Sequence, residues 1–212
     1  RISNNSAYDI SSDLNSFKDL TEGTIIARFD NTNKTGVQSI IGIGNDTDRN
    51  SHFHLYTFGD KVGFELRNQT QEGATESGTT NIARPSANVT LNEGINTIAF
   101  KVTNGEGYKI FVNGVLVLTV EDTNARFLDA IEDANKAYIG KTPRHSSATN
   151  MYSFNGDVDF VEIYGTTLED EVLLNKTAET TLVSDLETAI SSVEIIDEKE
   201  EYVAGDRISF NL

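Results

Sequence analysis

The sequence lacks cysteine altogether and contains only two prolines among its 212 residues. Without cysteine, the chain can form no disulfide, no thiolate metal site and no thiol nucleophile. Small secreted animal domains usually carry disulfides, whereas a large bacterial surface domain can do without them. The scarcity of proline, together with abundant glycine, asparagine and threonine, suits a chain of many strands joined by turns.

Positive charge is also scarce, since 17 lysines and arginines stand against 33 aspartates and glutamates, for a net charge of −16. Nucleic-acid binding depends on clustered lysines and arginines, and the sequence has no such cluster. Anionic membranes are disfavoured for the same reason, and no apolar run reaches the ~20 residues of a transmembrane helix. We therefore expect neither nucleic acid nor membrane insertion among the interactions of this chain.

The chain begins at Arg1 without a signal sequence, and we interpret it as part of a longer protein. Its length and its apolar content of 37% fit one large domain, or one domain plus a fragment of the next. We expect residues 1–180 to form the domain. Residues 181–212 are predicted to contain a linking helix (184–196) and the start of a following β module. We therefore expect a monomeric module within a multidomain protein.

Short runs of alternating apolar and polar residues recur along the chain, separated by glycine and asparagine turns. Asn113-Gly114 sits between two such runs and is the strongest short-range signal for a β-hairpin. Two short helices are also predicted, Ser11–Leu20 with a serine cap and Thr167–Ala178 with a threonine cap. The predicted fold class is therefore all-β, an antiparallel β-sandwich with short flanking helices.

One of these runs, VGFELRNQ, raises the question of function. In a strand, its apolar residues point into a core and its polar residues form a row on the outer face. Taken alone, such a row indicates a solvated face with a weak ion pair. An acidic chain with only eight arginines nonetheless places one of them here, beside a glutamate. The outer row consists of Glu65, Arg67 and Gln69, and the inner row of Val62, Phe64 and Leu66.

The chain carries, in this order, the segments FKDLTEGTIIARFD, GVQSIIGIGN, GFELRNQ, GINTIAFKV, YKIFVNG and YIGKTPR followed by FNGDVDFVEIYG. This order resembles the sialic-acid-binding lectin-like modules of bacterial sialidases, the family-40 carbohydrate-binding modules. The resemblance covers residues 9–178, and its most specific part is GFELR followed by GKTPR. It implies a sandwich of the concanavalin A or laminin G type (a jelly roll) and, as function, the recognition of terminal sialic acid on host glycans.

The resemblance also implies roles for individual residues. In that family, two arginines on neighbouring strands hold the sugar carboxylate, a glutamate beside the first contacts the ligand, and a tyrosine after the second packs against it. An arginine fork matches a planar carboxylate with two parallel charge-assisted bonds. Carried over residue by residue, the implied ligand-binding residues are Arg67, Arg144, Glu65 and Tyr152, with Tyr56, Val37 and Gln69 as further candidates.

Sialidase chemistry itself is not expected from this chain. The Arg-Ile-Pro motif and the Ser-x-Asp-x-Gly-x-Thr-Trp boxes of the sialidase propeller do not occur, and the sequence contains no tryptophan. We therefore predict a non-catalytic module that serves a sialidase or a surface adhesin and binds sialylated glycans such as sialyllactose. The resemblance implies an extracellular protein, secreted or cell-wall-anchored, of a Gram-positive bacterium.

A second hypothesis is a β-sandwich glycoside hydrolase, since the segment DVDFVE is similar to the acid triplet of retaining β-glucanases. Such enzymes need two carboxylates about 5 Å apart, one as nucleophile and one as acid. Asp157 and Asp159 share one face of the predicted strand, whereas Glu162 points to the other face unless a bulge intervenes. A third hypothesis is a structural spacer with a degenerate site.

Two weak patterns concern metal ions, and we expect no cofactor. Asp46, Asp48 and Asn50 are spaced like the first half of a calcium loop, but the glycine and the bidentate glutamate that complete such a loop are missing. The expected structure there is a polar turn, with bound calcium as the alternative. His52 and His54 lie on one face of a strand without an evident third ligand, so we expect two surface or half-buried histidines.

Overall fold

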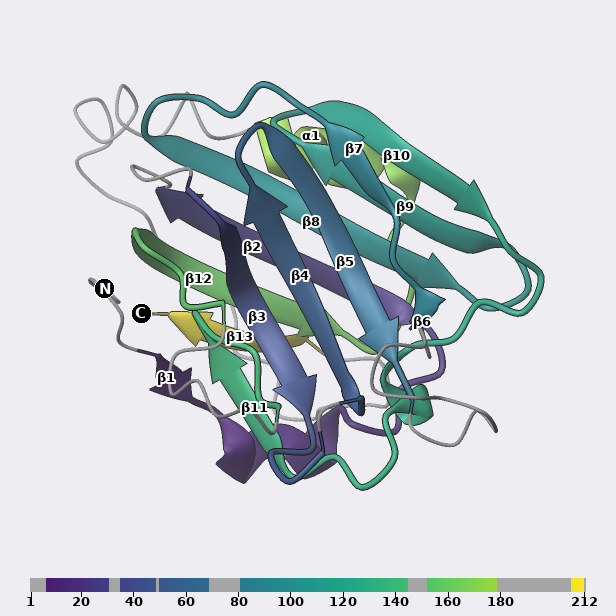
Figure 1. Cartoon of the computed structure of the whole chain (residues 1–212). Coiled ribbons are helices and arrows are strands. Elements are labelled where there is room, and N and C mark those ends of the chain that lie inside the picture. Colours follow the sequence, from purple (N-terminus) through teal and green to yellow (C-terminus); the bar gives the residue numbers. More distant parts are fainter. Residues whose placement is uncertain are drawn as a thin grey trace, which may run out of the picture.

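The computed structural model describes residues 7–30, 35–48, 50–68, 81–144, 152–178 and 207–211. In these residues, two antiparallel sheets pack face to face and enclose the hydrophobic core (Figure 1). The predicted all-β sandwich with short helices is thus confirmed. In the described part of the chain, no helix is long and apolar enough to cross a membrane.

The first sheet, called sheet A here, contains the strand with the polar row. Its strand order is β1–β11–β3–β4–β5–β6, and β7 also pairs with β5. Figure 1 shows its three long strands side by side, in front of the second sheet. The strands of sheet A are β1 (Tyr8–Asp9), β3 (Val37–Gly44), β4 (His52–Phe58), β5 (Lys61–Arg67), β6 (Asn81–Ala83), β7 (Ser86–Asn88) and β11 (Lys136–Ile139).

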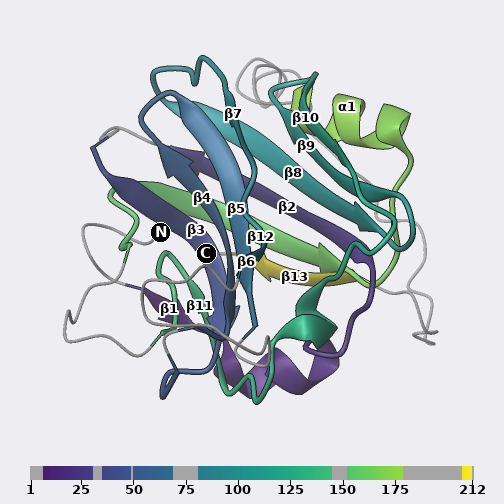
Figure 2. The ribbon, with the colours of Figure 1, turned by 45° about the vertical axis from the view of Figure 1, so that its right-hand side comes forward.

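The second sheet, sheet B, has the strand order β10–β9–β8–β2–β12–β13. The helix α1 (Asp170–Ala178) packs on its outer face, where Leu173 contacts Ala99 and Phe111 of the sheet (Figure 2). The strands of sheet B are β2 (Gly23–Asp30), β8 (Ile95–Thr103), β9 (Gly107–Val112), β10 (Val115–Glu121), β12 (Asp157–Tyr164) and β13 (Arg207–Asn211).

An aromatic core holds β4 and β5 firmly against sheet B. The ring of Phe64 on β5 lies 4.6 Å from that of Phe100 on β8 and 4.7 Å from that of Tyr108 on β9. Phe53 on β4 packs at 5.3 Å from the same Phe100 ring. Because interiors of this kind are close-packed, the outward side chains of β4 and β5 stand on a rigid base.

The local turn and helix predictions have mixed outcomes. Asn113 and Gly114 join β9 to β10 with φ values of 48° and 81°, as a two-residue hairpin loop of the predicted kind requires. The first helix is shorter than predicted, a 3-10 helix over Ser11–Ser16, and the Ser11 side chain does not cap it. The Ser11 hydroxyl instead accepts a hydrogen bond from the backbone of Ala137.

The C-terminal elements differ further from the sequence predictions. The helix predicted at Thr167–Ala178 begins only at Asp170, so Thr167 is not its cap. The strand Arg207–Asn211, predicted to open a following module, pairs with β12 and forms the edge of sheet B. This segment therefore belongs to the sandwich itself. The predicted linking helix at 184–196 and the boundary near residue 180 lie outside the described residues.

Candidate functional site

The polar row of β5 lies on the outer face of sheet A, as predicted, but it is not solvated. Glu65 points away from the core and is nevertheless only 2% exposed. The Arg67 side chain beside it is 16% exposed. The interpretation of this row as an ordinary solvated strand face is therefore wrong, because other residues cover it.

Two histidines of β4 lie next to Glu65. In the pairing of β4 with β5, His52 is opposite Arg67 and His54 is opposite Glu65. The Nε2 atoms of His52 and His54 lie 3.5 Å and 3.7 Å from the two carboxylate oxygens of Glu65. Both histidines are fully buried, so the expectation of surface or half-buried histidines is wrong. Their buried partner comes from the neighbouring strand, which spacing along one strand cannot reveal.

The histidines are neutral and the glutamate is ionised. Burial lowers the pKa of His52 to about 4 and lowers the pKa of His54 below its ordinary value. Burial also raises the pKa of Glu65, but the two imidazoles close to its carboxylate outweigh burial and hold that pKa well below its ordinary value. Thr142 Oγ1 lies 3.0 Å from His54 Nδ1, so the other ring nitrogen of His54 has a hydrogen-bonding partner of its own.

Each oxygen of Glu65 also contacts an arginine. Nε of Arg67 lies against Oε1, and Nε of Arg84 lies 3.1 Å from Oε2. Arg84 directly follows β6 at the edge of sheet A, and its side chain is 50% exposed. Arg84 was not among the predicted site residues, because only the pairing of β5 with β6 places it beside Glu65. In the sequence, Arg84 stands out only as one of eight arginines and by its position directly before Pro85.

Arg144 reaches this face because the chain after β11 crosses over β3. A Cβ atom at Gly42 would lie 2.5 Å from the carbonyl oxygen of Lys141, and one at Gly44 would lie 2.7 Å from that of Pro143. Glycine is needed wherever backbone approaches a strand this closely. The alternation of isoleucine and glycine in β3 is therefore a sequence signal for the crossing.

Tyr152 and Arg144 come together above β4. The Tyr152 ring stacks on His54 with centroids 5.3 Å apart, and its carbonyl accepts a hydrogen bond from the backbone of Ser39. The Arg144 guanidinium lies 5.8 Å from the Tyr152 ring centroid, and its Nη1 donates to the tyrosine hydroxyl at 3.4 Å. Tyr152 has a φ of 54°, a left-handed conformation that costs about 1 kcal/mol in a non-glycine residue. The surrounding contacts hold this backbone strain in place.

Tyr56, the predicted aromatic of the preceding strand, also belongs to this group. Its ring lies 4.9 Å from the ring of His54. A Cβ atom at Gly63 would lie only 2.8 Å from the Tyr56 hydroxyl, so the glycine lets this side chain extend across β5. Burial raises the pKa of Tyr56, and the positive charge of Arg84 opposes that shift. The tyrosine thus links β4 to the edge of the sheet.

The remaining predicted residues stand apart. Val37 opens β3 and pairs with Phe58, at the end of β4 remote from His52 and therefore from Arg67. Gln69 lies outside the described residues. The arginine cluster, as we call the group from here on, comprises Arg67, Arg84, Arg144, Glu65, His52, His54, Tyr56 and Tyr152.

The chemistry of the arginine cluster suits an anion. Among the described residues, His52, His54 and Glu65 are the one group whose potential metal-binding atoms lie within 4.8 Å of one another. Arginine contacts on both oxygens of Glu65 oppose a cation there by charge repulsion. Two guanidinium groups on one carboxylate, beside two neutral imidazoles, instead give this part of the cluster a positive charge.

In the candidate calcium loop, one carboxylate oxygen of each aspartate accepts a hydrogen bond from a protein group. The side chain of Asp46 accepts a hydrogen bond from Asn135 at 3.0 Å, and that of Asp48 accepts one from the backbone of Asn50 at 2.8 Å. Neither aspartate joins a group of three potential ligands among the described residues. Side-chain bonds of this kind are typical of polar turns.

The acid triplet of β12 lies on the other sheet. A bulge after Val158 shifts the alternation of β12, so the stated exception applies and Glu162 shares the outer face with Asp159. Asp159 Oδ2 lies 3.4 Å from Arg28 Nε, and Glu162 accepts a hydrogen bond from the Tyr164 hydroxyl at 2.7 Å. These separate contacts do not favour a catalytic carboxylate pair.

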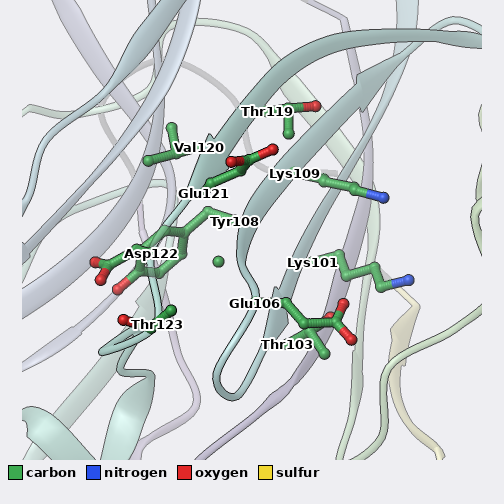
Figure 3. Close-up of a pocket in the computed structure, with 11 residues that line it drawn as sticks. Lys101, Thr103, Glu106, Tyr108, Lys109, Thr119, Val120, Glu121, Asp122 and Thr123 are labelled. Carbon is green, nitrogen blue, oxygen red and sulfur yellow. The ribbon is translucent and has the colours of Figure 1, made fainter.

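A cavity of about 670 Å³ also lies on sheet B, toward one end of β8, β9 and β10. In Figure 3 the lysines of this cavity extend toward one side and Tyr108 and Asp122 lie on the other. No residue of the arginine cluster lines it. Its lining residues are Lys101, Thr103, Glu106, Gly107, Tyr108, Lys109, Thr119, Val120, Glu121, Asp122 and Thr123.

Comparison with known proteins points to one family. A family model described as the N-terminal domain of sialidases matches residues 1–181. The anhydrosialidase of Macrobdella decora is 32% identical over 171 residues, which cover 77% of this chain and 22% of that protein. The chain therefore spans about a fifth of the length of this relative.

Solved structures agree with the sequence match. The CBM40 module of the Ruminococcus gnavus IT-sialidase, solved with α2,3-sialyllactose, is 29% identical with a TM-score of 0.73, covering 83% of this chain and 94% of that one. The same module has been solved with α2,6-sialyllactose. A leech intramolecular trans-sialidase in complex with 2,7-anhydro-Neu5Ac is 26% identical with a TM-score of 0.74, covering 85% of this chain and 27% of that one.

Proposed function

This chain belongs to the family of sialidase N-terminal domains, and we propose that it is a non-catalytic module that binds terminal sialic acid. The observation that carries this proposal is the placement of Arg67 and Arg144 on the same outer face of sheet A. Arg67 contacts the ionised Glu65, and Arg144 contacts Tyr152, which stacks on the neighbouring β4. Two arginine forks thus approach one region of an otherwise acidic protein.

In this proposal the sugar carboxylate lies between the two forks. An arginine binds a carboxylate through two parallel charge-assisted bonds, so two arginines orient the sugar as well as attract it. Glu65 keeps Arg67 in place and reduces the repulsion between the guanidinium groups. Tyr152 and Tyr56 offer ring faces to the apolar edges of the sugar and hydroxyl groups to its polar atoms.

The ligand class is supported by a relative. The CBM40 module from Ruminococcus gnavus, which this chain resembles over most of its length, was solved with α2,3- and with α2,6-sialyllactose. One monosaccharide site with few apolar contacts should be weak, with a Kd on the order of micromolar to millimolar. Useful attachment would then require several copies or a tethered partner domain.

The longer protein that contains this module is a sialidase or a surface adhesin in this proposal. A module of this kind would concentrate a sialidase on its substrate, or hold an adhesin on host glycans. We place it outside the cell, in a secreted or cell-wall-anchored protein of a Gram-positive bacterium, as a monomeric module. It would need no cofactor and no calcium for the sugar site.

Calorimetric titration with 3′-sialyllactose tests the proposal. Arg67→Ala and Arg144→Ala should each lower the affinity at least about tenfold, since each removes a charge-assisted contact worth roughly 1.5–3 kcal/mol. Arg67→Lys should also bind poorly, because an ammonium group cannot reproduce the planar fork.

The matched control for these variants is Arg126→Ala. Arg126 is half-exposed and paired with Asp129 outside the arginine cluster, so its loss should leave the affinity unchanged. If Arg67→Ala and Arg144→Ala both bind like the parent protein while folded, the site is assigned to the wrong face. If the parent protein itself binds no sialyllactose, the function is wrong.

A further inference from the structure

The residues that support the two proposed sugar-binding arginines meet at His54. Arg67 on β5 is in contact with Glu65, and Oε2 of this glutamate lies 3.7 Å from Nε2 of His54. The segment that crosses β3, called the crossing segment here (141–144), ends with the second arginine. The hydroxyl of Thr142 in this segment lies 3.0 Å from Nδ1 of His54. One imidazole therefore lies between the supports of the two arginines.

The connection from Thr142 to Arg144 is short and stiff. Only Pro143 separates the two residues, and a proline fixes its own φ and confines the residue before it to extended conformations. The crossing segment also lies directly on the backbone of β3, because a Cβ atom at Gly42 would be only 2.8 Å from Cα of Thr142. A shift of Thr142 should therefore shift the Arg144 guanidinium as well.

The contact between Thr142 and His54 is buried and polar. Both residues are fully buried, and apolar residues of similar size would fill the same space without burying polar atoms, which is unfavourable unless they are paired. The hydrogen bond adds a defined distance and direction between β4 and the crossing segment. The ring of Tyr152, whose hydroxyl accepts a hydrogen bond from Arg144, stacks on the same imidazole. The orientation of His54 therefore affects both contacts that lead to Arg144.

We propose that Thr142 and His54 are positioning residues of the sugar site, and that their buried contact fixes the spacing of the Arg67 and Arg144 forks so that both reach one carboxylate. This inference rests on the proposed function of the same site, and it requires neither positioning residue to touch the sugar. It predicts that loss of the Thr142 hydroxyl weakens recognition of the sugar carboxylate more than it weakens the other contacts with the glycan.

The test compares 3′-sialyllactose with its carboxamide, in which a neutral amide replaces the carboxylate. Circular dichroism establishes that each variant is folded, and calorimetry gives the ratio of the two affinities. The parent protein should bind the acid at least about tenfold more tightly than the amide, because the amide forms no charge-assisted pair with either fork. Thr142→Val keeps the shape of the side chain without the hydroxyl and should reduce this ratio about threefold or more. Thr142→Ser keeps the hydroxyl and should retain a ratio close to that of the parent protein.

Thr24→Val is the matched control for the loss of a buried hydroxyl. Thr24 is also fully buried, and its hydroxyl donates to the carbonyl oxygen of Thr166 at 3.2 Å, on sheet B and outside the arginine cluster. This variant should keep the parent ratio. Thr142→Ala removes the same hydroxyl as Thr142→Val without placing a methyl group beside the imidazole nitrogen, and it replaces Thr142→Val if that variant unfolds.

The inference is overturned if the folded Thr142→Val variant keeps the parent ratio, or if Thr142→Ser loses as much of the ratio as Thr142→Val does. An equal loss in Thr24→Val would also overturn it, because general destabilisation would then explain the effect. A parent protein that binds neither ligand would refute the proposed function, and one that binds the acid and the amide equally would refute the two arginine forks. The positioning role would fall with either result.

Discussion

The two outer faces of the sandwich both carry ion pairs, but they use them differently. On sheet B, Lys101 and Lys109 meet Asp170 at 2.9 Å and 2.5 Å, and the contacts tie α1 to the sheet. On sheet A, arginines outnumber the acid, and Glu65 is buried on a base of neutral histidines. Lysines act as point charges, whereas arginine forks present several donors in one plane. The first arrangement holds a helix against its sheet, and the second has the chemistry that we propose for binding a planar anion.

Burial sets the energetic difference between these faces. Asp170 remains 37% exposed, so water screens its pairs and they contribute little. Glu65 is almost inaccessible, and removing one partner from such a buried charge group leaves the others uncompensated. Mutations of Glu65 and of Asp170 should therefore change the free energy of unfolding by very different amounts.

The largest expected effect follows from Glu65→Gln. This substitution leaves the arginines on both sides without their negative charge, and we expect the free energy of unfolding to fall by about 3–5 kcal/mol. Asp170→Asn on sheet B is the matched control and should cost about 1 kcal/mol or less. Urea unfolding of both variants measures the difference. Equal losses at the two sites would contradict the contrast between the faces.

The pH dependence of stability sharpens the same comparison. The pKa of His52 is about 4 in the folded chain and 6.5 ordinarily. The unfolded chain therefore binds more protons between these values, so stability is fully present above pH 6.5 and is lost as the pH falls toward 4. The loss attributable to His52 is about 3 kcal/mol. Glu65, whose pKa is also lowered, adds a loss below its ordinary value of 4.5.

The contribution of sheet B should appear only at lower pH. The lowered pKa of Asp170 affects stability as the pH falls below its ordinary value of 3.8. Urea unfolding at a series of pH values between about 2.5 and 7 separates the two windows. Between about pH 4 and 7, the free energy of unfolding should rise with pH in the parent protein and should rise clearly less in His52→Gln. An unchanged pH dependence in that variant would exclude His52 as its source.

A smaller effect is expected from Gly42→Ala. The added Cβ atom would meet the carbonyl oxygen of Lys141 at 2.5 Å, so the crossing segment must move and carry Arg144 with it. We expect the affinity for 3′-sialyllactose to fall about tenfold, because one charge-assisted contact is displaced. Calorimetry on this variant would show parent-like affinity if the crossing does not position Arg144.

The control for this substitution is Gly165→Ala. There the nearest atom to an added Cβ is Cδ2 of Leu20 at 3.2 Å, the end of a flexible side chain. That variant should bind like the parent protein. A similar loss of affinity in both variants would indicate general destabilisation instead of a displaced arginine.

The fold followed from patterns that are local in the sequence. Alternation places Val62, Phe64 and Leu66 on the core side of β5, and Asn113-Gly114 forms the predicted hairpin between β9 and β10, because both features depend on neighbouring residues alone. The contacts between Glu65, Arg67, Arg144 and Tyr152 required more than pattern, and the resemblance to family-40 modules named these residues before the structure brought them to one face.

The features that were missed depend on pairing between distant segments. The burial of His52 and His54 arises from the segment that crosses β3 and from Tyr152 above β4. Arg84 joins the cluster only through the pairing of β5 with β6. Likewise, the bulge that turns Glu162 is a property of how β12 pairs with β2. None of these pairings has a signature within a single strand.

The edge of sheet A has a consequence for the behaviour of the molecule at high concentration. Along β5 the outermost partners are two three-residue strands, β6 and β7, with Arg84 and Pro85 between them. Long, continuous edge strands invite other chains to add themselves, and short strands, proline and charge discourage this. The break between β6 and β7, which places Arg84 at the proposed sugar site, therefore also leaves no continuous edge strand with which a neighbouring molecule could pair. Many copies of the domain on one surface should thus not associate through this edge.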